Sequence, residues 1–244
     1  MKTQRLEQLV ERFATRRIAV IGDFFLDKYL DVDPSLDEPS LETGKTAHQV
    51  TGARVGPGAA GTVVNNLAAL DAGTLYAVGA IGDDGEGFEL RRELERIRCD
   101  TDRLLRFDWL MTPTYLKPRD QTDASLAGEH SRYDTLTRTP MPDEIVEEIV
   151  GALDSVLPEV DAVIIADQVV QDECGVVTPF LRDVLSERAE QFADLVFWAD
   201  SRSNIRMFRN VITKPNQFEA AGRLNPHPDD TVTLCELKAA AGVL

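Results

Sequence analysis

The most informative part of the chain is Pro57-Gly-Ala-Ala-Gly-Thr-Val-Val-Asn-Asn-Leu-Ala-Ala-Leu70, soon followed by Val78-Gly-Ala-Ile-Gly-Asp-Asp-Gly85. Gly56-Pro57-Gly58 indicates a tight turn, and the small and apolar residues after it predict a helix over about 59–72. The apolar run 75–81, which stops at glycine and aspartate, is typical of a buried parallel strand that enters a loop. A turn, a helix and a buried strand in this order predict an α/β fold.

The same alternation extends in both directions from this stretch. Toward the N-terminus, helical spacing is expected over 4–14 and a buried strand over 17–22. Strands that alternate with helices at this spacing predict a three-layer fold, in which helices cover both faces of a parallel sheet. Toward the C-terminus, the expected elements are helices at about 86–98, 142–156 and 177–192, strands at 161–166, 194–199 and 210–213, and helical stretches at 216–222 and 231–242.

Two segments, 31–54 and 103–137, fall outside this alternation. Each is polar or mixed in composition, contains two prolines and shows only weak β-like spacing. We expect a single domain over 1–244, in which these two insertions pair with each other as a small β lid.

The composition excludes several classes of protein. Lys and Arg total 26 against 42 Asp and Glu, so the net charge is −16. A surface this acidic repels phosphate backbones, which argues against nucleic acid as a partner. No apolar run is long enough to cross a bilayer, and residues 1–17 lack an apolar signal-peptide core. We therefore expect a cytoplasmic protein with no membrane partner.

Ligands of open α/β sheets bind at the carboxyl ends of the strands, so the residues that follow each strand are candidates. Asp23 and Asp27 follow the first strand, and their carboxylates are able to accept hydrogen bonds from ligand hydroxyls. The alternative for both is loop capping.

Gly56, Gly58 and Gly61 have the spacing Gly-x-Gly-x-x-Gly and precede a helix, where small residues let a ligand approach the backbone. A simple tight turn is the alternative. The same spacing is typical of dinucleotide-binding oxidoreductases. We disfavour that class, because 49–55 is a poor buried strand and no acidic residue ends a strand roughly 20 residues further on.

Lys214-Pro-Asn-Gln-Phe-Glu219 places Asn216 as a helix N-cap and Glu219 at the third helical position. This pattern predicts a capping box. The functional alternative is that Glu219 holds a water on Mg²⁺ near nucleotide phosphates. Further candidate charges are Asp200 and Arg202 after a strand, and Lys117, Arg119, Arg132 and Asp134 in the second insertion, with exposed surface charges as the alternative for each.

These pieces, in this order, resemble the ribokinase/PfkB carbohydrate kinase family from about Arg17 to Leu244. The stretches 57–70 and 78–85 are similar to the family's N-terminal signature, and 214–219 is similar to its Asn-x-x-Glu motif. Gly22-Asp-Phe-Phe-Leu-Asp-Lys-Tyr29 is most similar to the start of the bacterial heptose 7-phosphate kinases.

The resemblance implies a transfer of the γ-phosphoryl group from ATP, with Mg²⁺, to a hydroxyl of a sugar or sugar phosphate. It also implies a homodimer through 31–54 and 103–137. Two positions depart from the family pattern, because Ala59 replaces a usual glycine and Thr62 replaces a usual sugar-binding asparagine. The implied substrate-binding residues are Asp27, Gly58, Ala59, Thr62, Lys117 and Arg132, and the implied nucleotide and metal residues are Asn216 and Glu219, the latter through a water.

The family's general base lies in a Gly-Ala-Gly-Asp motif well after Asn-x-x-Glu, together with the backbone amides that form an anion hole. Residues 220–244 contain no such motif, so the resemblance places the base beyond Leu244 in a fold that is truncated at its C-terminus. We therefore expect little or no turnover from this chain alone. A non-catalytic sugar-binding or interaction module derived from a kinase is the alternative.

Overall fold

The computed structural model describes residues 3–123, 125, 128–171, 173–223, 226–227 and 229–242. Its main body is a seven-stranded sheet in the order β13-β12-β11-β1-β6-β7, with β8 also paired to β6. Every pairing in this sheet is parallel. The strands are β1 (Arg17–Gly22), β6 (Thr74–Gly82), β7 (Cys99–Asp100), β8 (Leu104–Phe107), β11 (Ala162–Asp167), β12 (Val196–Ser201) and β13 (Ile212–Thr213).

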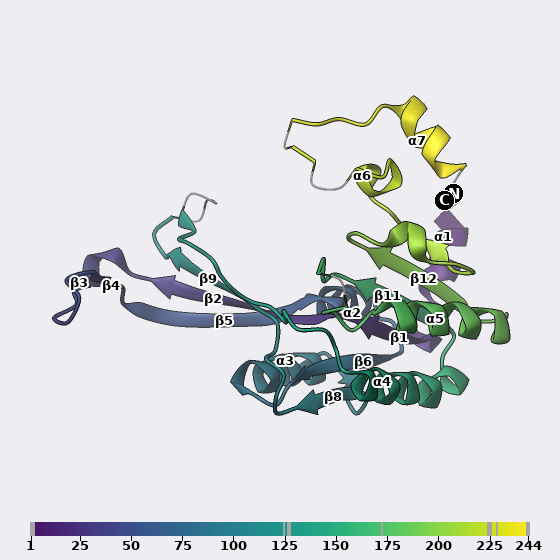
Figure 1. The fold of residues 1–244 in the computed structure, drawn as a ribbon, viewed down its shortest axis with the longest axis horizontal. Helices are drawn as coiled ribbons and strands as arrows, with labels where there is room; N and C mark the ends of the chain where they lie inside the picture. Colours follow the sequence, from purple (N-terminus) through teal and green to yellow (C-terminus); the bar gives the residue numbers. More distant parts are fainter. Residues whose placement is uncertain are drawn as a thin grey trace.

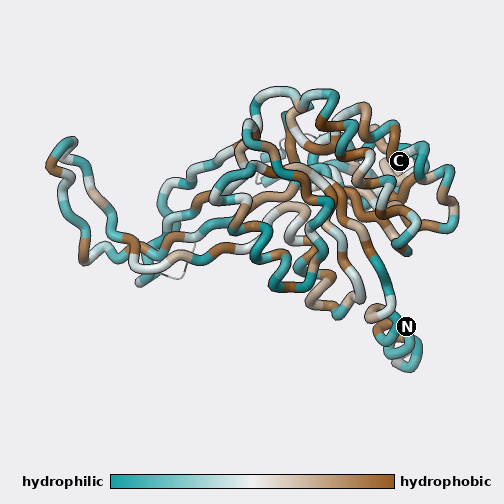
Figure 2. The backbone as a smooth tube through the Cα atoms, turned by 90° about the horizontal axis from the view of Figure 1, so that it is seen from below, coloured by the Kyte–Doolittle hydropathy of each residue, from teal (hydrophilic) through white to brown (hydrophobic). Residues whose placement is uncertain are grey.

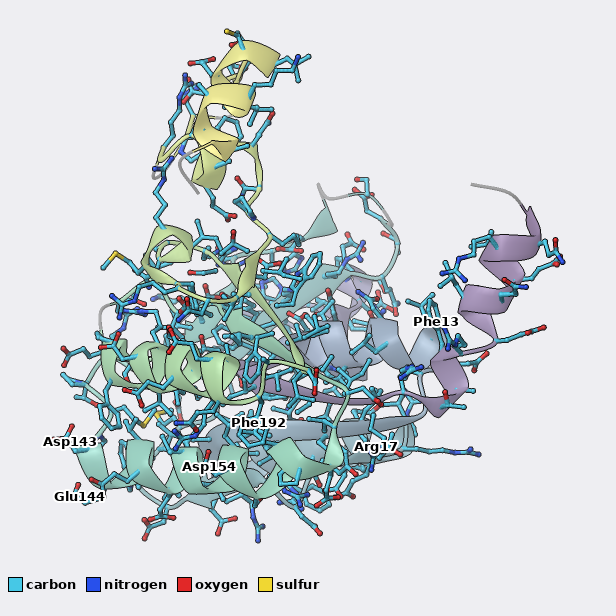
Figure 3. The ribbon with its side chains drawn as sticks, turned by 90° about the vertical axis from the view of Figure 1, so that its right-hand side faces the viewer. Phe13, Arg17, Asp143, Glu144, Asp154 and Phe192 are labelled. Atoms are coloured by element: carbon cyan, nitrogen blue, oxygen red, sulfur yellow. The ribbon has the colours of Figure 1, made fainter. Side chains whose placement is uncertain are left out.

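Helices cover both faces of this sheet, which confirms the predicted three-layer α/β fold (Figure 1). On one face, α2 (Ala60–Ala69) and α3 (Gly85–Arg96) pack on β1 and β6. On the other, α4 (Asp143–Val156) and α5 (Pro179–Gln191) form the larger core and lie side by side (Figure 3). Arg188 of α5 joins the two helices, because its guanidinium donates to Asp154 of α4 at 2.7 Å.

A second sheet, in the order β10-β9-β2-β5, extends away from the body as a lid (Figure 1). Hydropathy changes from residue to residue along its strands, as expected for a sheet with two different faces (Figure 2). Its strands are β2 (Phe24–Val32), β5 (Val50–Ala59), β9 (Thr114–Asp120) and β10 (Tyr133–Thr135), and the hairpin β3 (Glu38–Pro39) and β4 (Thr46–Ala47) lies at its tip.

The remaining elements are short. Two α-helices, α6 (Gln217–Ala220) and α7 (Leu234–Ala241), follow β13, and α1 (Thr3–Val10) precedes β1. None of the described helices is both long enough and apolar enough to cross a bilayer. The 3₁₀ turns are η1 (Phe13–Thr15), η2 (Pro34–Leu36), η4 (Leu157–Glu159) and η5 (Ile205–Met207).

The predicted turn at Gly56-Pro57-Gly58 is wrong, because these residues continue strand β5. They pair antiparallel with β2, in the register Asp27 to Gly56 and Phe25 to Gly58. Proline is tolerated there because β5 is an edge strand, where a missing N–H breaks no ladder hydrogen bond.

The lid strands also differ from the two predicted insertions. The central strand β2 begins at Phe24, before the first predicted segment, and pairs with both β5 and β9. In the second segment, β8 pairs with β6 and so extends the main sheet instead of the lid. The parts of that segment that do join the lid are β9 and β10.

Candidate substrate-binding site

One face of the lid gathers several of the predicted substrate residues. Asp27 of β2 lies between Gly56 of β5 and Tyr115 of β9 in the strand register. Residues that are directly paired across strands point to the same face of a sheet. Next along β5, a Cβ atom added to Gly58 would lie 3.0 Å from Oδ2 of Asp27. Glycine on β5 therefore leaves space in front of this carboxylate.

Lys117 closes the other side of Asp27. Its Nζ atom donates to Oδ1 of Asp27 at 2.7 Å and to the hydroxyl of Tyr29 at 3.3 Å. It also lies 4.9 Å from the ring centre of Tyr29 and 5.7 Å from that of Tyr115. Burial lowers the pKa of Lys117, but the hydrogen bonds and charges of Asp27 and Tyr29 outweigh it, so the pKa is raised. Lys117 is therefore a fixed positive charge at neutral pH.

Arg132 extends this group of charges. Its guanidinium lies 4.4 Å from the ring centre of Tyr115, and it donates to both oxygens of Asp134 at 2.7 and 2.8 Å. The structure thus brings Asp27, Gly58, Lys117 and Arg132 to one face of the lid, with a carboxylate beside each cation. Such a surface presents acceptors for hydroxyl groups and donors for an anionic group side by side.

Ala59 and Thr62 lie beside this group with less direct roles. Ala59 has φ of 51° and ψ of −118°, a conformation that favours glycine. Thr62 is exposed, and its hydroxyl donates to the backbone oxygen of Pro57 at 3.3 Å. Thr62 thus makes a local hydrogen bond that joins the first turn of α2 to the end of β5.

Asn216 and Glu219 form the predicted capping box at the start of α6. The Asn216 N–H donates to Glu219 Oε2 at 2.7 Å, and the Glu219 N–H donates to Asn216 Oδ1 at 2.9 Å. Both residues also line a cavity of about 400 Å³ together with Arg202 and Arg223. No group of three or more metal-binding side chains occurs among the described residues, so a metal here would keep most of its waters.

The fit to Mg²⁺ rests on the half-buried carboxylate of Glu219. Each of its oxygens accepts one hydrogen bond from Asn216, which leaves a second lone pair on each oxygen for a metal-bound water. The residues present therefore fit a magnesium ion held through water.

Asp23 is almost fully buried, with 3% of its surface exposed. Its carboxylate accepts hydrogen bonds from the backbone N–H groups of Gln168, Val169 and Val176 at 2.7, 3.0 and 2.7 Å. This is the loop-capping alternative. Burial raises the pKa of Asp23, against the three backbone donors, which lower it.

Sequence reasoning missed three residues of this region. The rings of Tyr29 and Tyr115 lie beside Lys117. For Tyr29, the sequence offered a signal, because a residue two positions after Asp27 lies on the same face of a strand. Asp167 ends β11 and accepts from the hydroxyl of Ser201 at 2.7 Å, and burial raises its pKa to about 6.

The Gly-x-Gly-x-x-Gly spacing does not lie in a dinucleotide-binding context. Gly56 and Gly58 belong to the lid strand β5, which pairs antiparallel with β2, and Gly61 is in α2. The dinucleotide fingerprint requires a buried parallel strand directly before these glycines.

Comparisons with known proteins bear on the fold and on sequence relatives. No family model matches the chain. The bifunctional protein HldE of Hyphomonas neptunium is 29% identical over 231 residues, which cover 91% of this chain and 44% of that protein. The chain thus spans about half the length of the curated relatives that it matches along most of its sequence.

Solved structures give the fold. Phosphofructokinase-2 from Escherichia coli in complex with fructose-6-phosphate has a TM-score of 0.59 at 18% identity, over 93% of this chain and 69% of that one. Ribokinase from Arabidopsis thaliana, complexed with ribose and ATP, has a TM-score of 0.55 at 16% identity, over 93% of this chain and 67% of that one. The resemblance inferred from the motifs is therefore confirmed: the chain has the fold of the ribokinase/PfkB carbohydrate kinases and is related in sequence to HldE.

Proposed function

We propose that this chain forms the sugar-binding part of a carbohydrate kinase that transfers the γ-phosphoryl group of ATP to a hydroxyl of a sugar or sugar phosphate. The observation that carries the proposal is the Asp27–Lys117 pair on the lid face, opposite the glycines of β5. In this proposal, Asp27 accepts hydrogen bonds from sugar hydroxyls, while Lys117 and Arg132 bind a phosphate or another polar group of the substrate.

The nucleotide belongs at the Asn216–Glu219 cavity in this proposal. Arg202 and Arg223 line that cavity and supply positive charge for the phosphates of ATP. When bound, Mg²⁺ would neutralise charge on the transferred group, and Glu219 is the residue that would hold it through a water. ATP and sugar phosphates are metabolites of the cytoplasm, so the proposal implies action there.

Phosphoryl transfer also needs a group that takes the proton of the attacking hydroxyl, and donors that stabilise the developing negative charge. The two candidate sites contain no residue to which we assign that role. We therefore propose that these 244 residues alone bind sugar and nucleotide but turn over slowly or not at all. By resemblance, a second copy pairs with this chain in a homodimer through 31–54 and 103–137.

The test has two parts. Titration calorimetry should detect binding of a sugar or sugar phosphate from a panel of hexoses, heptoses and their phosphates, and an ADP-release assay with the same panel should show no sugar-dependent rate. Sugar binding without any ATP binding would favour the non-catalytic module. NADH binding without sugar or ATP binding would favour the oxidoreductase and refute the kinase proposal.

A further inference from the structure

Asp23 is a buried carboxylate with an unusual set of partners. All three of its described hydrogen bonds go to backbone N–H groups of one loop, the described residues of 168–176, which follows β11. No cation lies among these partners. A buried acceptor without its donors costs more than an exposed one, so Asp23 strongly favours the docked position of this loop.

Gly175 shows how closely the loop approaches Asp23. A Cβ atom added to Gly175 would lie 2.9 Å from Asp23 Oδ1 and 2.9 Å from the Cβ atom of Val169. Neither neighbour is a flexible chain end, since the carboxylate is hydrogen-bonded and Val169 is buried. The loop therefore has little freedom to shift while Asp23 holds it.

The loop contacts the lid face on one side. Val169 and Cys174 are buried in a small cluster with Phe25 of β2, against which Ala59 and Tyr115 also pack. Phe25 and Tyr115 pack against each other with tilted rings whose centres are 5.1 Å apart, and Tyr115 carries the contacts to Lys117 and Arg132. A movement of the loop would thus be transmitted to the aromatic floor of the candidate sugar site.

The same loop reaches the second candidate site on its other side. Val170, the next residue after Val169, lines the cavity of Asn216 and Glu219. Val169 and Val170 are consecutive, so the loop contacts the lid cluster through one and the candidate nucleotide cavity through the other. Asp23 holds the backbone at this point, because it accepts from the Val169 N–H.

We propose that Asp23 is a positioning residue that couples the lid face to the Asn216–Glu219 cavity through the 168–176 loop. This inference rests on the proposed function for its meaning, because the two surfaces would hold the two substrates. Its physical content, a mechanical link between the two surfaces, is measurable without any turnover.

The test is hydrogen exchange of Asp23→Asn compared with the unchanged chain. Asparagine offers one oxygen in place of two, and its amide faces the loop donors, so the N–H groups of Gln168, Val169 and Val176 should exchange about tenfold faster. If the loop is the link, exchange should also rise in the lid strands around Phe25 and Tyr115 and in the segment around Asn216.

Val184→Ala is the matched control, because it removes buried apolar surface from α5 while leaving Asp23 and Gly175 unchanged. It should raise exchange broadly, with no preference for the lid cluster and the cavity. Gly175→Ala provides a second route, since it should displace the loop while keeping Asp23 intact, and it should reproduce the pattern of Asp23→Asn.

An increase confined to 168–176 in both loop variants, with the lid and cavity unchanged relative to Val184→Ala, would overturn the proposal. A second readout is binding of fructose 6-phosphate and of ADP by calorimetry. In the folded Asp23→Asn variant, we expect the effect of one ligand on the affinity for the other to be lost. If the unchanged chain binds no sugar or sugar phosphate of the panel and no adenine nucleotide, the proposed function fails, while the exchange pattern still decides the coupling.

Discussion

Ala59 has a backbone conformation that its side chain disfavours. At φ of 51° and ψ of −118°, an L-residue with a Cβ atom is strained, whereas glycine is not. We predict that Ala59→Gly raises the free energy of unfolding by about 1 kcal/mol, measured by urea denaturation. Ala68→Gly in α2 is the control, and it should lower stability by a similar amount because its backbone is helical. Equal destabilisation by both changes would contradict the strain argument.

Asp167 should give stability a measurable pH dependence. Its pKa is raised from 3.8 to about 6, mainly by burial, so the folded chain keeps this proton at pH values where the unfolded chain has lost it. The contribution of Asp167 to stability is therefore complete below about pH 4 and falls by up to about 3 kcal/mol as the pH rises through 6.

The measurement is chemical denaturation from pH 4 to 7 on the unchanged chain and on Asp167→Asn. Asparagine does not titrate, so the stability of the variant should rise relative to the unchanged chain across this window. Parallel curves would mean that Asp167 is not perturbed as the structure indicates.

At this scale, the sequence indicated candidate residues but not their contacts. Asp27 and Lys117 were both expected near a substrate, but their 2.7 Å ion pair depends on the parallel register of β2 and β9, which joins residues 90 positions apart. Local patterns carry no information on such a register. For Asp23, the sequence allowed hydrogen bonds either from ligand hydroxyls or from loop N–H groups. Only the fold shows that loop N–H groups face its carboxylate.

The element α6 separates two roles of one residue. Glu219→Gln keeps an oxygen that accepts from the Asn216 N–H but removes the charge, whereas Asn216→Ala removes the cap. We predict that Glu219→Gln changes stability by less than about 0.5 kcal/mol yet weakens Mg²⁺-dependent ADP binding. Asn216→Ala should cost about 1 kcal/mol of stability.

The free energy of unfolding is measured by chemical denaturation, and the affinity for ADP is measured by calorimetry with and without Mg²⁺. If Glu219→Gln binds ADP with the same magnesium dependence as the unchanged chain, Glu219 only caps the helix.

Elements of the main sheet were predictable because a buried parallel strand is an unbroken apolar run. The lid strand β2 was not, since it carries Asp27, Lys28 and Asp31, and aspartate and lysine are uncommon in strands. The turn predicted at Gly56-Pro57-Gly58 failed for a related reason. Glycine and proline usually mark turns, but here they lie in an edge strand, where proline is tolerated and Gly58 leaves room for the Asp27 carboxylate.

On the scale of the whole molecule, one part of the main sheet carries an exposed apolar face. Val196, Trp198 and Ile212 on β12 and β13 are 46%, 38% and 49% exposed, although both faces of parallel sheets are normally covered. Trp198 also pairs with Ile212 across the strands, so the side chains form one continuous patch.

We predict that Trp198→Thr reduces self-association, measured by light scattering after gel filtration, and changes stability by less than about 1 kcal/mol. Phe197→Thr, one residue earlier and 3% exposed, points into the core and should cost at least about 3 kcal/mol. If the unchanged chain stays monomeric at high concentration, the patch does not drive self-association.

The most direct test of the central claim is titration calorimetry of the 244-residue chain with a panel of sugar phosphates, repeated on Asp27→Asn and Lys117→Met. The account predicts that at least one sugar phosphate binds, that Asp27→Asn weakens binding of the sugar part by about tenfold or more, and that Lys117→Met weakens the phosphorylated sugar more than its unphosphorylated form. Binding that is unchanged in both variants, or no binding by the unchanged chain, would contradict the assignment of the lid face as a sugar site.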